Sequence, residues 1–164
     1  MQAVAVGQPI QTDATVFAEL YPSLRAFAAV TGSVDVEPDD LVQEAVARTL
    51  RSHRLVDLDD AGAYLRRAIV NLAANRRRSM ARWRLAVARL DRVDEAQAAH
   101  YASDLDDLRR LAPDARALLF MVEVEGCSYA EAADVLGISE EAARTRGARA
   151  RRQLRADLEG VTDE

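Results

Sequence analysis

Residues 128–158 read SYAEAADVLGISEEAARTRGARARRQLRADL, and this stretch decides the fold. Ser128 precedes an apolar segment and is followed three positions later by Glu131, which is the spacing of a capping box at a helix start. Gly137 suits the left-handed residue that ends such a helix, and Ser139 suits the cap of the next one. The stretch therefore predicts a short helix, a tight turn at Gly137 and a long second helix.

The second predicted helix has two distinct faces. Small residues recur at three- and four-residue steps and form a narrow stripe suited to packing, namely Ala143, Gly147, Ala150 and Leu154. The opposite face carries Glu141, Thr145, Arg149 and Arg152, flanked by Arg144, Arg151 and Arg155 on one side and by Arg146 on the other. A helix-turn-helix with so basic a second helix is typical of DNA binding, although a basic face that meets only solvent is the alternative.

The whole chain has an ordinary globular composition, with 49% apolar and 30% charged residues among 164. Its formal net charge of −5 argues against nucleic-acid binding only if the charge is spread evenly. Residues 66–92, however, carry nine arginines against Asp91, a charge of +8, and residues 144–155 carry six arginines and no acid, a charge of +6. Two basic segments on an acidic body would confine DNA to chosen surfaces and leave acidic ones for a basic partner.

The chain has too few cysteines and histidines for a disulfide-stabilised domain or a zinc-binding domain. The single Cys127 excludes a disulfide framework within the chain, and His53 and His100 add too little for a zinc site of cysteines and histidines. We therefore expect no metal and no cofactor. The first residues show neither a basic segment nor a long apolar run, so we expect no signal peptide and no membrane span, and a cytoplasmic protein.

Apolar residues at helical spacing predict two helices before residue 52. The first runs from Asp13 to about Gly32. The second begins at Pro38, with Asp39 and Asp40 in its first turn, where proline and acids favour a helix start. Its predicted buried stripe consists of Leu41, Val42, Ala45, Val46 and Leu50.

A loop over residues 52–60 precedes a long third helix, which Asp59 or Asp60 caps and which continues to about Trp83. One edge of this helix carries polar and cationic side chains in a single strip, namely Arg67, Asn71, Asn75 and Arg78. Asparagine is a poor residue inside a helix, whereas amides and guanidinium groups bind bases and phosphates. The strip therefore indicates DNA binding, with a solvated surface as the alternative.

The predicted fold is all-α, because no segment alternates as a strand does. We expect two small helical domains joined by a linker. The predicted ranges are a tail over residues 1–12, a first domain over 13–84, a partly helical linker over 85–103 and a second domain over 104–160. The second domain would contain four short helices, one of which starts at Pro113.

Three segments, in order, resemble a bacterial RNA polymerase sigma factor of the extracytoplasmic-function type, in the sigma-70 family. DDLVQEAVARTL is similar to the family's core-polymerase-binding helix, and AYLRRAIVNLAANRRR is similar to its downstream-promoter helix. Residues 111–155 are similar to its upstream-promoter helix-turn-helix. The resemblance implies an alternative sigma factor that binds core polymerase and directs it to promoters. Sigma region two would melt and read the minus-ten element, and region four would read the minus-thirty-five element.

The resemblance also implies roles for particular residues. Residues that would dock on the clamp helices of the polymerase β′ subunit are Asp40, Leu41, Val42, Gln43 and Glu44. Asn71 matches the asparagine that helps to open and read the minus-ten element, so the strip that it shares with Arg67, Asn75 and Arg78 joins that surface. The loop over 52–60 matches the specificity loop that pockets a flipped base, which adds His53 and Arg54, and Tyr64 stands where the family often has tryptophan.

For the minus-thirty-five element, the matching positions are Arg144, Thr145, Arg146 and Arg149, and Glu141 and Arg152 share their exposed face. The chain departs from the family at Ala142, Ala143 and Gly147, where larger residues are usual. The polymerase β flap is a further implied partner besides promoter DNA. An anti-sigma factor that holds the two domains until a signal arrives is common in this family.

Two other functions remain open to the sequence. A stand-alone regulator would use the same helix-turn-helix as a dimer on palindromic DNA, without core polymerase. A metal-dependent nuclease or phosphotransferase would use Asp39, Asp40 and Glu44, but acids at a helix start more often complement the helix dipole. No glycine-rich phosphate loop or nucleophile with a base accompanies them, so we expect no catalytic residue and no enzyme.

Overall fold

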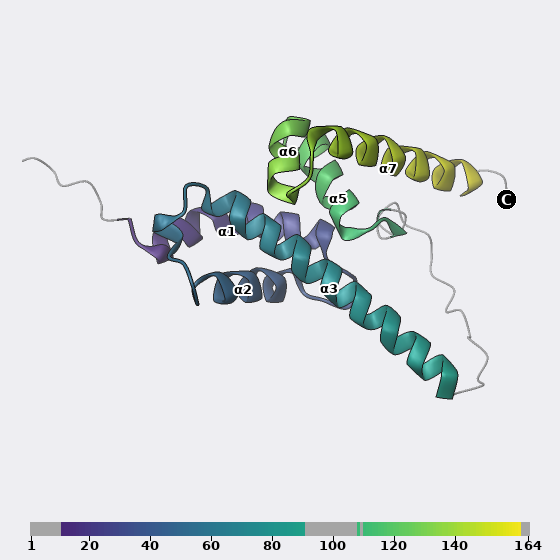
Figure 1. Ribbon diagram of the computed structural model, residues 1–164, viewed down its shortest axis with the longest axis horizontal. Helices are drawn as coiled ribbons and strands as arrows, with labels where there is room; N and C mark the ends of the chain where they lie inside the picture. Colours follow the sequence, from purple (N-terminus) through teal and green to yellow (C-terminus); the bar gives the residue numbers. More distant parts are fainter. Residues whose placement is uncertain (1–10, 91–107, 109, 162–164) are drawn as a thin grey trace, which may run out of the picture.

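The computed structural model describes residues 11–90, 108 and 110–161, and this part of the chain is helical with no strand (Figure 1). The all-α prediction is therefore confirmed. The helices are α1 (Asp13–Thr31), α2 (Pro38–Thr49), α3 (Ala61–Leu90), α5 (Pro113–Leu119), α6 (Tyr129–Leu136) and α7 (Glu140–Val161). A short 3-10 helix, Leu55–Asp57, lies in the predicted loop, and a π-helix, Phe120–Val124, continues α5.

Local sequence signals start the first three helices. Thr12 and Thr15 form a reciprocal cap at the start of α1, and Pro38 occupies the first turn of α2. The Asp60 carboxylate accepts a hydrogen bond of 2.7 Å from the Ala63 backbone N–H and so caps α3, as predicted. These helices pack on one another through fully buried side chains, among them Leu24, Phe27, Leu41, Leu65 and Ile69.

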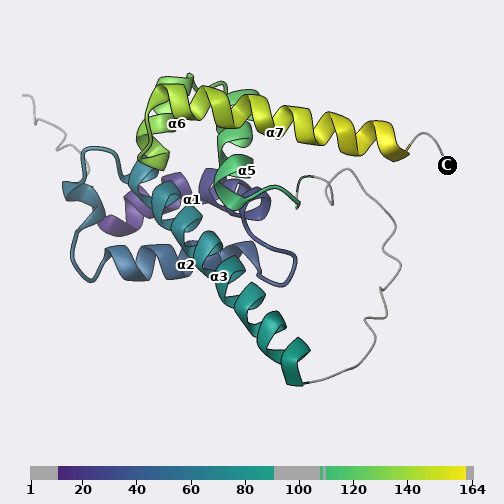
Figure 2. The same cartoon turned by 45° about the vertical axis from the view of Figure 1, so that its right-hand side comes forward.

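Helix α3 is longer than the sequence predicted. It continues to Leu90 and therefore includes the first six positions of the predicted linker over residues 85–103. No glycine or proline occurs between Gly62 and Pro113, so no residue in this stretch is a strong helix breaker. Figures 1 and 2 show the end of α3 projecting away from the other helices. The remaining linker, residues 91–103, lies outside the described residues, and the domain boundaries stay predictions.

The predicted helix-turn-helix is confirmed in its details. Ser128 and Glu131 form the capping box of α6, with the Ser128 backbone N–H donating to the Glu131 carboxylate at 2.7 Å. Gly137 has a φ of 66° in the turn, where a side chain would be strained, and the Ser139 hydroxyl accepts from the Ala142 N–H at 3.2 Å. The small-residue stripe of α7 packs inward, with Ala143 fully buried.

The two halves of the chain pack against each other in this structure. Helices α5 and α6 lie over α1 and α3 (Figure 2), and the rings of Phe27 and Phe120 meet edge to face at 6.0 Å. The buried Arg116 donates a hydrogen bond of 2.5 Å to the Thr31 carbonyl at the end of α1. Arg66 of α3 and Glu125 form an ion pair of 2.9 Å. The halves therefore share one continuous core.

Candidate nucleic-acid interface

Helix α7 presents an unengaged ridge along its exposed side. Glu141, Thr145, Arg149 and Arg152 are all exposed, and none has a side-chain hydrogen bond or ion pair within the part of the chain that the structure describes. The ridge includes the first turn of α7, where recognition helices contact base edges. Arg149 and Arg152 follow further along, where guanidinium groups can hold phosphates. The geometry therefore leaves the centre of the predicted surface available to DNA.

Three of the four arginines on the two flanks of this ridge are held by acids. Arg144 donates from Nε and Nη2 to Glu140 at 3.0 and 2.5 Å, and Arg146 donates to Asp114 of α5 at 2.6 Å. Arg151 donates to Glu123 at 2.8 Å and to the Tyr129 hydroxyl at 2.6 Å. Two predicted contact residues, Arg144 and Arg146, are thus engaged within the protein. Only the Glu140 and Arg144 pair, one helical turn apart, has a sequence signal.

The predicted strip on α3 exists and faces outward. Arg67, Asn71, Asn75 and Arg78 are all exposed. Arg78 donates to the Asn75 side-chain carbonyl at 2.5 Å, and the Arg67 guanidinium lies directly against Gly137 in the turn of the second half. Asn71 and Arg78 also line a groove of about 500 Å³, to which Arg146 of α7 contributes the opposite wall. The structure therefore brings residues of both predicted DNA surfaces to one groove.

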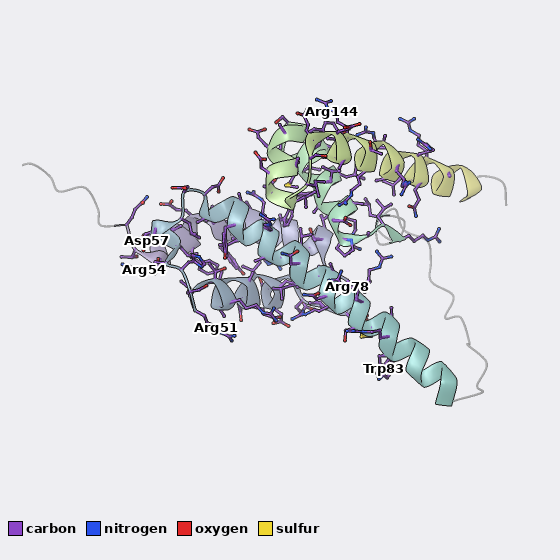
Figure 3. The ribbon with its side chains drawn as sticks, in the orientation of Figure 1. Arg51, Arg54, Asp57, Arg78, Trp83 and Arg144 are labelled. Carbon is purple, nitrogen blue, oxygen red and sulfur yellow. The ribbon has the colours of Figure 1, made fainter. Side chains whose placement is uncertain are left out.

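The loop that precedes α3 carries an exposed aromatic pair. The ring of His53 lies 5.3 Å from the ring of Tyr64, whose side chain is 39% exposed, and the Ser52 hydroxyl is 2.8 Å from His53 Nδ1. Tyr64 is therefore not a core residue here. Arg54 pairs with Asp13 at 3.5 Å, and the Val56 N–H donates to the same carboxylate at 3.1 Å. These bonds fix the loop to the start of α1, far from Arg144 in Figure 3.

The predicted polymerase-docking residues divide into two groups. Asp40 and Gln43 are exposed, whereas Leu41 and Val42 are fully buried against α1 and α3. The docking role of these residues stays a prediction, and in this arrangement the core encloses the side chains of Leu41 and Val42. Their burial orients α2 so that Asp40 and Gln43 face outward, and this is how Leu41 and Val42 would contribute to docking.

Glu44 lies between these groups and bridges α2 to α3. Its carboxylate accepts from Arg48 and from Arg76, both at 2.5 Å. Burial raises the pKa of Glu44, but the hydrogen bonds and positive charges of Arg76 and Arg48 outweigh it, and the pKa lies below its ordinary 4.5. Glu44 is therefore ionised at neutral pH and already committed to two arginines.

Two of the three acids considered for a metal site, Asp39 and Glu44, are also engaged. Asp39 accepts from the Tyr21 hydroxyl at 2.7 Å and from Arg25 at 3.1 Å. Across residues 11–90, 108 and 110–161, no three histidine, cysteine, aspartate or glutamate side chains gather as metal ligands would. In the same residues, no helix has the length and apolar character needed to cross a membrane. Nothing in these parts favours a metal-dependent enzyme.

Residues 108–154 match the model of the family described as sigma-70, region 4. The match covers α5, the turn and most of α7, which includes the free ridge. This segment is therefore similar to sigma-70 region 4. A comparison with curated protein sequences found no match for this chain.

Solved structures resemble this chain along most of its length. The sigma factor RpoE of Bartonella quintana, in complex with the anti-sigma factor NepR, aligns with a TM-score of 0.68 and 22% identity over 89% of this chain and 96% of its own. CnrH, in complex with the cytosolic domain of CnrY, aligns with a TM-score of 0.59 and 26% identity over 93% and 89%. The Mycobacterium tuberculosis extracytoplasmic function sigma factor SigJ aligns with a TM-score of 0.58 and 22% identity over 86% of this chain and 52% of its own. The fold is that of an extracytoplasmic-function sigma factor.

Proposed function

We propose that this protein is an alternative sigma factor that binds core RNA polymerase through the exposed face of α2 and directs it to promoters. The strip on α3, with His53 and Arg54 of the preceding loop, would melt and read the minus-ten element. The ridge of α7 would read the minus-thirty-five element. The protein would recruit and orient the polymerase, which performs the nucleotide transfer.

The observation that carries this proposal is the ridge of α7. A helix-turn-helix in the matched segment holds Glu141, Thr145, Arg149 and Arg152 in one exposed row, and no acid within the described residues pairs with either arginine. The remaining surfaces support the proposal. Asp40 and Gln43 lie exposed on an acidic helix that a basic partner helix could meet, and Asn71 lies exposed on the basic helix α3.

This function requires the two halves to separate on DNA. The minus-ten and minus-thirty-five elements are named for positions about 25 base pairs apart, which is about 85 Å of duplex at 3.4 Å per base pair. Asn71 and Arg146 line the same groove in this structure, so one rigid arrangement cannot serve both elements. The arrangement described here is therefore that of the protein before it engages a promoter.

The same proposal names the partners and the cellular location. The partners are core polymerase, through its β′ clamp and β flap, and promoter DNA in the cytoplasm. An anti-sigma factor is a further proposed partner. It is supported by the complex of the similar RpoE with the anti-sigma factor NepR, and CnrH was also solved with a partner.

Binding to purified core polymerase, followed by run-off transcription from a pool of genomic fragments, tests the proposal. We expect binding and new promoter-dependent transcripts that share upstream sequences. Arg149→Ala should retain core binding and lose most of these transcripts, whereas Asp40→Ala should weaken core binding itself. If the protein binds duplex DNA but not core polymerase, the stand-alone regulator would be favoured instead. No observation made so far supports that alternative.

A further inference from the structure

Tyr129, the first residue of α6, packs against α7 at Gly147, where α7 has no side chain. A Cβ atom placed on Gly147 would lie 2.9 Å from the Tyr129 hydroxyl oxygen, closer than real Cβ contacts, and 3.0 Å from Cε1 of its ring, which is tighter than most. Glycine inside a helix costs about 1 kcal/mol relative to alanine. Here the missing side chain makes room for the ring, so the two residues form one packing unit.

Two arginines of α7 engage the ring that this unit holds. The guanidinium carbon of Arg144 lies 5.1 Å from the ring centre, within the range of a cation–π contact. On the hydroxyl side, Arg151 donates to the Tyr129 oxygen at 2.6 Å, and this bond is the main cause of the raised pKa of Arg151. Tyr129 is therefore held by its hydroxyl while the face of its ring meets Arg144.

We propose that Tyr129 is a positioning residue of the DNA-reading helix, which acts by holding the guanidinium of Arg144 for promoter DNA. This inference rests on the proposed function of α7. Glu140 and the Tyr129 ring fix Arg144 from two sides, while 63% of the Arg144 side chain stays exposed. Arg144 has five N–H donors, of which the Nε and one Nη2 donor meet Glu140, so three remain for DNA.

Holding Arg144 in advance favours binding because the ordering of a long side chain opposes association. Ordering one such side chain on binding lowers the affinity about three- to tenfold. A planar group fixed against a ring also presents its donors in one orientation, which suits discrimination between base edges. Loss of the ring should therefore weaken binding and broaden base preference at the position that Arg144 meets.

The test uses the full chain with core polymerase and a pool of promoters randomised across the minus-thirty-five element. Tyr129→Leu removes the ring and keeps apolar bulk, whereas Tyr129→Phe keeps the ring and removes the hydroxyl. We expect Tyr129→Leu to lower affinity about three- to tenfold and to relax preference at one base position. Tyr129→Phe should retain that preference. The loss caused by Tyr129→Leu should vanish in an Arg144→Ala background and persist in an Arg149→Ala background.

A second pair of variants separates positioning from simple damage to the fold. Gly147→Ala should displace the ring and reproduce the relaxed preference, and adding Tyr129→Leu should relieve the crowding and cause no further loss. The Arg144 Nε–H resonance reports the ring contact without DNA, and we expect its shift toward the free-arginine value in Tyr129→Leu. An equal affinity loss with and without Arg144, or unchanged base preference, would overturn the inference. If the wild-type protein gives no promoter-dependent transcripts while this resonance still shifts, the proposed function fails instead, and the DNA role of Tyr129 fails with it.

Discussion

The ion pair between Arg66 and Glu125 makes the contact between the two halves measurable. Arg66 belongs to α3, Glu125 follows the π-helix after α5, and their nearest atoms are 2.9 Å apart. Each side chain is only 20% exposed, and the Arg66 guanidinium also lies 5.9 Å from the centre of the Phe27 ring. Glu125→Gln removes the charge and keeps the shape, so it tests the pair with little change in packing.

The expected free energy follows from this partial burial. Two unit charges 4 Å apart attract by about 4 kcal/mol at an effective dielectric of 20, and desolvation of both groups offsets much of this. A hydrogen bond to a charged group contributes about 1.5–3 kcal/mol in net terms. We therefore expect a coupling energy of about 1–2 kcal/mol between Arg66 and Glu125, with little dependence on salt.

A double-mutant cycle in urea denaturation measures this coupling. It compares the free energies of unfolding of the wild type, Glu125→Gln, Arg66→Met and the double variant, so that the loss of the contact with Phe27 cancels. The exposed pair of Arg144 and Glu140 serves as a matched control, for which about 0.3–0.5 kcal/mol is expected. A coupling no larger than that of the control would refute the inference that this pair joins the halves.

The same pair should oppose promoter binding if the halves separate on DNA. A contact that stabilises the packed halves lowers the apparent affinity of the protein for promoter DNA, which binds only the separated halves. The decrease is about tenfold for each 1.4 kcal/mol. Glu125→Gln should therefore bind promoter DNA about five- to thirtyfold more tightly in complex with core polymerase. A weaker promoter affinity with normal core binding would contradict the separation of the halves.

Three further predictions concern the proposed surfaces. Arg149→Ala should weaken promoter binding and reduce the slope of log affinity against log salt by about 1 if Arg149 holds a phosphate, whereas Arg25→Ala on α1 should leave both unchanged. Leu41→Ala should lower the free energy of unfolding by about 2–5 kcal/mol because Leu41 is fully buried, whereas Asp40→Ala should weaken core binding with little change in urea denaturation. The pKa of Glu44 is lower in the folded protein than in the unfolded chain. The ionised carboxylate therefore stabilises the fold above the unfolded-state pKa, and this stabilisation is lost as pH falls through the folded-state pKa. The difference in free energy of unfolding between wild type and Glu44→Gln should accordingly shrink below about pH 5. A gap that stays constant down to pH 3 would show that these arginines do not favour the ionised form.

Short-range signals were sufficient to predict most of the helix starts and the turn. The capping box at Ser128, the left-handed Gly137 and the first-turn Pro38 each depend on residues within three or four positions, and each was found as expected. Periodicity also placed Leu41 in the core, whereas the family resemblance placed it on a docking surface. The structure agrees with periodicity there, because a motif identifies a helix that docks without specifying which of its side chains face outward.

Contacts between distant segments could not be predicted in the same way. Asp114 and Arg146 are 32 positions apart, and Arg66 and Glu125 are 59 apart, so their pairing depends on how the helices pack and not on local spacing. The closeness of Tyr129 to Gly147 has the same origin. The sequence marked Gly147 as a member of the small-residue stripe and as a departure from the family, whereas the ring that it makes room for lies on another helix.

The charge of α7 shows why this difference matters for function. The sequence assigns +6 to residues 144–155, but Arg144, Arg146 and Arg151 each pair with an acid in the folded protein. Within the described residues, Arg149, Arg152 and Arg155 are exposed and have no such partner. The paired arginines are already ordered and partly neutralised, so they suit orientation, whereas the free ones can release counterions from phosphates. Under the proposed function, the basic run thus separates, once folded, into exposed arginines that attract DNA and paired arginines that fix how it is read.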